Sequence, residues 1–274
     1  MIALSIASLA ATWALGNLAV AAMQRRLIFK PPRLVRELVR GPHAGEFEVE
    51  ALQLTVAPGV QLEGWRSMPV DGRAPRATVL YFGGRGEHVR WAPLMSMHSR
   101  DVSVVAFNHR GFGGSGGVST EASVMADARA IHAHLQPTLR PGAPLIVMGR
   151  SLGTAVALRL AAAVQPDALI LLSPFTRLGA VLRRNPLLIP ATWLLRHRFE
   201  VEADARQIRC PTLVMLAVGD RSVANRLSER LARQIGAPTE VARIAGELHR
   251  SLPRCLPVQQ RVAAFIDRVA PLRG

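Results

Sequence analysis

LIVMGRSLG, residues 145–153, joins an apolar run to a serine that lies between two glycines. Residues 145–148 predict a buried strand, and the run from 154 to 161 predicts a helix. Between them, residues 149–153 fit G-x-S-x-G, the pattern of a sharp strand-to-helix turn that exposes the serine hydroxyl. This turn would place Ser151 at a helix N-terminus, where free backbone N–H groups favour a developing oxyanion. An ordinary Gly/Ser loop is the alternative, because so short a pattern also occurs by chance. The surrounding sequence has to distinguish the two.

Continuous apolar runs on both sides of this motif predict a parallel sheet. Such runs are typical of strands that are covered by helices on both faces. Amphipathic helical patterns lie at 124–135, where Ser119 or Thr120 is the expected N-cap, and at 223–235 and 258–269. The predicted fold class is therefore α/β, a doubly wound domain with a mostly parallel central sheet and helices on both faces. The predicted strands comprise residues 77–82, 102–107, 145–148, 168–172, 212–217 and 239–244.

An antiparallel hairpin is expected at the start of this sheet. Residues 47–51 alternate apolar and acidic side chains, whereas the apolar residues from Leu52 onward continue on the other phase. This change of phase predicts a strand that bulges or ends near Ala51. The pair Pro58-Gly59 then predicts a turn into a second strand at 60–65.

The loops after the predicted strands supply partners for Ser151. A hydroxyl nucleophile needs a general base, and the base needs an orienting carboxylate. In a doubly wound sheet these groups lie beyond the carboxyl ends of the strands, in the chain order serine, acid, histidine. Asp220 follows strand 212–217, and His249 follows strand 239–244 and is the only histidine after Asp220. The sequence therefore predicts Ser151, Asp220 and His249 as the catalytic residues.

Two backbone N–H groups are expected to hold the oxyanion of an acyl-transfer reaction. The first belongs to Leu152, directly after the serine. Residues 83–86, GGRG, follow strand 77–82 and lack the Lys-Ser/Thr ending of a phosphate-binding loop, so Arg85 is the expected second donor. Gly149 and Gly153 are the small residues that the turn around Ser151 requires.

The composition argues against several other classes of protein. The chain has 274 residues and a net charge of +15, which would suit nucleic acid or anionic lipid. Its basic residues are scattered arginines, Lys30 is the only lysine, and aromatic residues make up 5%. We therefore predict no nucleic-acid partner, because a base-stacking surface needs aromatic side chains. Cys210 and Cys255 are far apart and no His/Cys cluster has metal-ligand spacing, so no cofactor and no metal site are predicted.

The N-terminal residues predict a membrane anchor. Residues 2–23 contain no charged side chain, and a helix of that length crosses ~30 Å of hydrocarbon. Ala19-Val20-Ala21 resembles a signal-peptidase site, but no basic region precedes the apolar run, which favours an uncleaved anchor over a cleaved leader. The basic residues that follow predict a single-pass protein with a cytoplasmic catalytic domain, an exported domain being the alternative. The predicted division is an anchor over 1–24, a basic linker over 25–45 and a catalytic domain over 46–274.

The chain resembles the alpha/beta-hydrolase superfamily, in particular its small membrane-anchored serine hydrolases. The resemblance covers the chain from residue 25 onward. It has two departures, since the superfamily often has His-Gly in place of Gly83-Gly84 and Asp-Tyr or a similar pair in place of Asn108-His109. The residues that carry it are 25–29, 80–84, 108–116, 149–153, 219–220 and 246–249.

The resemblance implies acyl transfer to water without a cofactor. Ser151 would attack a carbonyl carbon, His249 would act as general base and then general acid, and Asp220 would orient His249. The expected substrate is a carboxylic ester, lipid-like or otherwise hydrophobic. A serine peptidase or a thioesterase with the same three residues is the alternative, and a non-catalytic membrane-anchored binding protein is the alternative of a different class.

A long connection between strands 168–172 and 212–217 predicts a cap insertion over residues 174–206, because usual connections are much shorter. Residues 187–190 and 193–195 are apolar, which would give a site above Ser151 hydrophobic walls. An ordinary crossover helix that only packs on the sheet is the alternative. The arginines that flank the apolar residues are Arg183, Arg184, Arg196 and Arg198.

Overall fold

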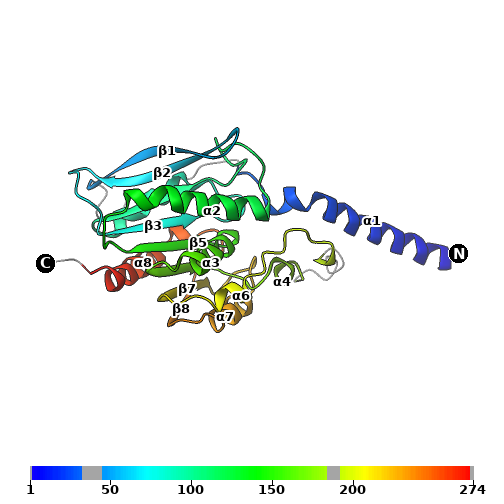
Figure 1. Ribbon diagram of the computed structural model, residues 1–274. Helices are drawn as coiled ribbons and strands as arrows, with labels where there is room; N and C mark the ends of the chain where they lie inside the picture. Colours follow the sequence, from blue (N-terminus) through cyan, green and yellow to red (C-terminus); the bar gives the residue numbers. More distant parts are fainter. Residues whose placement is uncertain (1, 33–44, 184–191, 272–274) are drawn as a thin grey trace.

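A twisted sheet with helices on both faces forms the body of the protein (Figure 1). The computed structural model describes residues 2–32, 45–183 and 192–271. Among these, eight strands pair in the order β1-β2-β4-β3-β5-β6-β7-β8. The six strands from β3 to β8 pair in parallel, whereas β1 and β2 are antiparallel at one edge. The predicted α/β fold class with a mostly parallel sheet is confirmed.

The parallel strands lie where apolar runs predict them, because strands buried on both faces must be apolar throughout. Every residue of β4, β5, β6 and β7 is buried. β5 continues two residues beyond its predicted end, to Arg150. The strands are β1 (Phe47–Ala57), β2 (Val60–Pro69), β3 (Ala77–Phe82), β4 (Val102–Phe107), β5 (Leu145–Arg150), β6 (Ala168–Leu172), β7 (Thr212–Ala217) and β8 (Thr239–Ile244).

The helices cover the sheet in two groups. One apolar core includes side chains from α2, α3 and α7, and the other includes side chains from the 3-10 helix η1 and from α8. Thr120 caps α2, as one of the two residues expected there. The helices are α1 (Ile2–Ile28), η1 (Val89–His98), α2 (Glu121–Leu135), η2 (Gln136–Thr138), α3 (Leu152–Val164), α4 (Leu178–Leu182), α6 (Glu202–Ala205), α7 (Asn225–Ala232), η4 (Leu252–Arg254) and α8 (Leu256–Val269).

The expected hairpin is present, but the expected break near Ala51 is wrong. Ala51 pairs with Trp65 in an unbroken ladder, and the register shifts only between Thr55 and Ala57. β1 is an outer strand on which most side chains are exposed or half-buried. Its side chains can therefore change phase without any change of backbone, which is why the pattern misleads.

α1 projects from the domain, with the N-terminus at its far end (Figure 1). It extends to Ile28, four residues into the predicted basic linker, and residues 33–44 of that linker lie outside the described residues. Within the described part of the chain, no helix is both long and apolar enough to cross a membrane. The predicted membrane-spanning helix over residues 1–24 is therefore not confirmed.

Candidate active site

Ser151 occupies a strained turn between β5 and α3. Its φ is 50° and its ψ is −118°, a conformation that non-glycine residues rarely adopt and that concentrates at functional sites. The backbone N–H of Ser151 donates to Leu172 O at 2.8 Å, which fixes the turn to the end of β6. A Cβ on Gly149 would overlap the backbone of Gly153, and one on Gly153 would overlap that of Phe82. Both glycines of the motif are thus required by close backbone approach.

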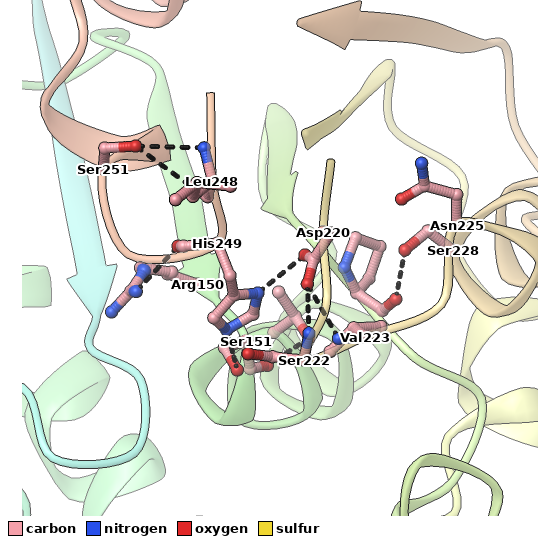
Figure 2. A network of polar contacts seen from close by, with 12 residues as sticks. Arg150, Ser151, Asp220, Ser222, Val223, Asn225, Ser228, Leu248, His249 and Ser251 are labelled. Atoms are coloured by element: carbon pink, nitrogen blue, oxygen red, sulfur yellow. Dashed lines mark hydrogen bonds and ion pairs between the residues drawn. The ribbon is translucent and has the colours of Figure 1, made fainter. Parts of the chain in front are cut away.

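The structure brings the three predicted catalytic side chains into one hydrogen-bonded chain (Figure 2). His249 Nε2 lies 3.0 Å from Ser151 Oγ, although the two residues are 98 positions apart in the sequence. On the other side of the ring, His249 Nδ1 lies 2.7 Å from Asp220 Oδ2. An ionised carboxylate can only accept, so Nδ1 carries a proton and the neutral ring leaves Nε2 free to accept from the serine hydroxyl.

Asp220 is held as an anion by the groups around it. Its Oδ1 accepts hydrogen bonds from the backbone N–H groups of Ser222 at 2.7 Å and Val223 at 2.8 Å. Burial alone would raise the pKa of the Asp220 carboxyl, but the hydrogen bond and charge of His249 and these two N–H groups outweigh it, so the pKa lies below its usual range. The charge that orients His249 is therefore present at neutral pH.

Of the two expected oxyanion donors, Leu152 directly follows the serine and Arg85 lies in the loop after β3. Leu152 is the first residue of α3, so its backbone N–H is among those with no acceptor inside the helix. Arg85 lies in the exposed turn that follows β3. The neighbouring Gly84 N–H donates to Glu87 Oε2 at 2.6 Å, which ties this turn down. The donor roles of Leu152 and Arg85 stay predictions.

An ion pair that sequence reasoning missed lies beside the serine. Arg150 precedes Ser151, and its Nη1 lies 2.8 Å from Glu87 Oε2. Arg150 Nη2 donates to the carbonyl oxygen of His249 at 2.9 Å (Figure 2). Both side chains of the pair are at least nine-tenths buried. Arg150 occupies a variable position of the G-x-S-x-G motif and Glu87 lies in the loop after β3, so neither residue type was required by a sequence pattern.

The two departures from the superfamily pattern have a structural reason. A Cβ on Gly83 would lie 2.6 Å from Val89 Cγ1, so this position has no room for a histidine side chain. Instead the ring of His109 reaches the same loop, with Nε2 2.9 Å from Gly83 O. Burial lowers the pKa of His109, so its neutral ring donates through Nε2 to that carbonyl. His109 therefore anchors the loop after β3, residues 83–86, that contains the expected donor Arg85.

The described part of the predicted cap is attached to the helices that follow β4 and β5. Arg198 N donates to Glu121 Oε2 at 2.7 Å, at the start of α2. Arg159 Nε on α3 donates to Asp204 Oδ2 at 3.1 Å. Trp193 is 71% exposed and Leu194 49% exposed. The apolar residues 187–190 lie outside the described residues, so the cap over Ser151 stays a prediction.

Metal binding and thiol reactivity are the other kinds of chemistry relevant to the described ranges. They contain no group of three or more His, Cys, Asp or Glu side chains placed to hold a metal ion. Cys210 and Cys255 are both free thiols. Burial raises the pKa of the Cys210 thiol to about 11, so it stays protonated and unreactive at neutral pH.

Comparison with known proteins identifies the family. Residues 73–200 match the family model described as serine aminopeptidase, S33. An uncharacterized protein of Mycobacterium tuberculosis is 36% identical over 197 residues, which cover 70% of this chain and 69% of that protein. The chain belongs to the alpha/beta-hydrolase superfamily. This hydrolase is also 30% identical to the lysophosphatidylserine lipase ABHD12 of Danio rerio. The match covers 54% of this chain but only 44% of that lipase.

Solved structures support the fold of this alpha/beta hydrolase. The esterase Pf2001 of Pyrococcus furiosus matches with a TM-score of 0.67 at 20% identity, over 88% of this chain and 98% of the esterase. XC6422 of Xanthomonas campestris, described as an a/b serine hydrolase without lid, matches with a TM-score of 0.62 at 20% identity, over 83% and 97%. At such identities the similarity carries the fold alone.

Proposed function

We propose that this hydrolase cleaves carboxylic esters through an acyl-enzyme on Ser151. The observation that carries the proposal is the chain of hydrogen bonds from Ser151 Oγ through the His249 ring to Asp220. Ser151 Oγ forms a bond to the carbonyl carbon while His249 Nε2 takes the hydroxyl proton. The alcohol then departs with that proton. Water deacylates the enzyme by the same route, so one ester and one water yield an acid and an alcohol.

The negative charge that develops on the carbonyl oxygen would be held by backbone donors. The N–H of Leu152 at the start of α3 and the N–H of Arg85 are the proposed pair. The helix N-terminus favours the charge for the same reason that it favours any anion. Removing one such donor in other hydrolases costs on the order of 10²- to 10³-fold in turnover, so displacing the turn at Arg85 should lower turnover by a similar factor.

Labelling with a fluorophosphonate probe tests this function. The probe forms a covalent bond with an activated serine, so wild-type protein should be labelled and the Ser151→Ala variant should not. A change of thermal midpoint of less than a few degrees would show that the variant is folded. Labelling that persists in the Ser151→Ala variant would overturn the assignment of the nucleophile.

We further propose that the ester substrate is lipid-like. Two facts support this choice: the ABHD12 relatives are lysophosphatidylserine lipases, and the cap segment contains apolar residues. Each methylene buried by an acyl chain contributes up to ~0.8 kcal/mol, so kcat/KM should rise over several carbons and then level off. A p-nitrophenyl ester series from acetate to palmitate measures this. A strict preference for acetate, or equal rates throughout, would contradict the lipid-like substrate.

A serine peptidase is the second candidate, which the description of the matching family model favours. The same three residues can cleave an amide, with His249 protonating the leaving amine. Aminoacyl p-nitroanilides and esters of matched side chain separate the two functions. An enzyme that cleaves the anilides at least as efficiently as the best ester would be assigned as a peptidase.

Membrane attachment through α1 is a proposal of its own. Two observations and one general principle support it. Trp13, Leu15 and Leu18 of α1 are 48% to 66% exposed, the last turn of α1 carries Arg25 and Arg26, and anionic lipid attracts such basic residues. Full-length protein should sediment with membranes and a variant lacking residues 1–24 should not. If the intact protein remains in the supernatant, the attachment is wrong. Protease that reaches the domain only in opened cells would support the cytoplasmic side.

A further inference from the structure

We propose that the buried Arg150–Glu87 ion pair is a positioning device. It fixes two loops to the serine turn (residues 149–153): the histidine loop (residues 246–249) and the proposed oxyanion loop (residues 83–86). This inference rests on the proposed function, because it concerns the geometry of that reaction. Neither side chain is placed to touch the reacting atoms, so both are positioning residues. Their contacts join three segments that are far apart in the sequence. All three must be correctly placed relative to one another for acyl transfer.

Arg150 connects the serine turn to the histidine loop. It directly precedes Ser151, so its backbone cannot move without moving the nucleophile. Its Nη2 donates to the backbone carbonyl of His249 at 2.9 Å. That contact acts on the main chain of the base and leaves both ring nitrogens to Ser151 and Asp220. The guanidinium thus holds the main chain of His249, while Asp220 orients the ring, and together they set the position of the ring relative to Ser151 Oγ.

Glu87 connects the same guanidinium to the oxyanion loop. Its Oε2 accepts from Arg150 Nη1 at 2.8 Å and from the Gly84 N–H at 2.6 Å. Gly84 directly precedes Arg85, the proposed oxyanion donor. A Cβ on Gly84 would lie 3.1 Å from Arg150 O and 3.3 Å from Arg150 Nη1, so the loop and the arginine are in close contact.

The second carboxylate oxygen of Glu87 is held from the far side. Its Oε1 accepts from Tyr81 Oη at 2.8 Å and from Trp91 Nε1 at 3.1 Å. Tyr81 belongs to β3 and Trp91 to η1, so the carboxylate is fixed to the sheet and to a covering helix. Arg150 is thereby held by a partner that is itself immobile.

This arrangement is costly if its only role is stability. Burying two charges carries a large desolvation penalty, and apolar replacements of similar volume are often neutral or stabilising. Losing one partner alone is strongly destabilising, because the other charge is left buried and unpaired. Positioning gives the pair a benefit that apolar residues cannot supply, since a displacement of about 1 Å in an active site can cost ~10²-fold in rate.

The double variant Glu87→Gln/Arg150→Met separates positioning from stability. It removes both charges, keeps a side-chain oxygen that can accept from Gly84, and keeps an apolar stem at position 150. The contact with the His249 carbonyl is lost. The glutamine has no second acceptor for Trp91 Nε1. We therefore expect a folded protein with a somewhat lower thermal midpoint, kcat lower by ~10²-fold and KM for a short p-nitrophenyl ester unchanged within about twofold. Wild-type kcat in this variant would overturn the inference.

A matched control removes another buried ion pair. Arg110 Nη2 lies 2.6 Å from Asp127 Oδ1, and these side chains are 14% and 6% exposed. This pair joins the turn after β4 to α2. The variant Arg110→Met/Asp127→Asn should therefore keep kcat within about twofold of wild type. An equal loss of kcat in this control would mean that removing any buried ion pair lowers activity, which contradicts a specific positioning role.

Arg150→Lys covers the case in which the double variant does not fold. A lysine keeps the charge for Glu87 but lacks the planar fork that reaches two acceptors. We expect a folded protein with kcat reduced at least tenfold and unchanged KM, and full kcat would contradict the role of the fork. Fluorophosphonate labelling of wild-type protein is measured in parallel. Its absence would reject the proposed function, whereas labelled wild type with active variants would reject only the positioning role.

Discussion

The backbone of Phe82 occupies the space that a side chain on Gly153 would need. A Cβ on Gly153 would overlap the carbonyl of Phe82, and the next carbonyl, that of Gly83, is also too close. The end of β3 and the first turn of α3 are therefore in direct backbone contact. Because neither backbone can rotate away as a side chain can, this contact fixes the distance between the serine turn and the loop after β3.

Gly153→Ala should lower the free energy of unfolding by about 3 kcal/mol and abolish activity, since overpacking in a tight site typically costs 1–3 kcal/mol and here the obstacle is backbone. Urea denaturation and ester hydrolysis measure the two effects. Gly16→Ala is the matched control, because a Cβ there meets nothing within 4 Å. An active, fully stable Gly153→Ala protein would mean that the close approach is wrong.

Asp220→Asn should reduce kcat by about three to four orders of magnitude, since the amide no longer stabilises the protonated histidine or selects its tautomer. The controls are Asp204→Asn and Asp167→Asn. Asp204 pairs with Arg159, and Asp167 accepts from the Leu145 N–H, so both are expected to affect stability more than kcat. If Asp204→Asn were the variant that loses turnover, the acid would be misassigned.

Ser151→Gly should be more stable than Ser151→Ala by about 1 kcal/mol, because a residue with a Cβ is strained at φ 50° whereas glycine adopts it freely. Both variants lack the hydroxyl and should be inactive, so the comparison isolates the backbone. Chemical denaturation of the two proteins side by side gives the difference. Equal stabilities would show that the turn stores no strain.

Acid should destabilise the wild-type protein through Glu87. Burial raises the pKa of its carboxyl, but the Arg150 guanidinium, the Gly84 N–H and the Tyr81 hydroxyl outweigh it and bring the pKa below the ordinary value of 4.5. A lowered pKa means that the carboxylate contributes its full stability above about pH 4.5 and loses it as the pH falls through the folded-state value. The stability difference between wild type and Glu87→Gln should therefore shrink below pH 4.5. A difference that does not change with pH would contradict the charge on Glu87.

Much of the fold could be predicted because strands that are buried on both faces appear in the sequence as continuous apolar runs. β3, β4, β6 and β7 begin and end at their predicted residues, since each must be apolar on both faces. β1 has no continuous apolar run, because most of its side chains are exposed or half-buried. α7 begins at Asn225 and ends at Ala232, although its apolar pattern extends from 223 to 235, because buried side chains can also come from the loops at both helix ends.

The residues of the site also fall into two groups, those that the sequence predicts and those that it does not. Ser151, Asp220 and His249 could be nominated from chain order and strand ends, and the structure brings them together. The Arg150–Glu87 pair could not be nominated, because a buried charge is recognisable only by the partner that it meets in space. His109 precedes Asp220 in the chain, so chain order excludes it as the base. Its contact with Gly83 O depends on a packing detail at Val89 that sequence spacing does not contain.

The exposed character of β1 also affects the solution behaviour of the protein. Within the described residues β1 has one partner strand, β2, and it lies at the edge of the sheet (Figure 1). Its other edge is a template for pairing with a second molecule. Glu48 is exposed on this strand and opposes such pairing by charge repulsion, whereas Glu50 is ion-paired with Arg66 of β2. Neutralising Glu48 should therefore promote edge-to-edge aggregation while leaving each catalytic group in place.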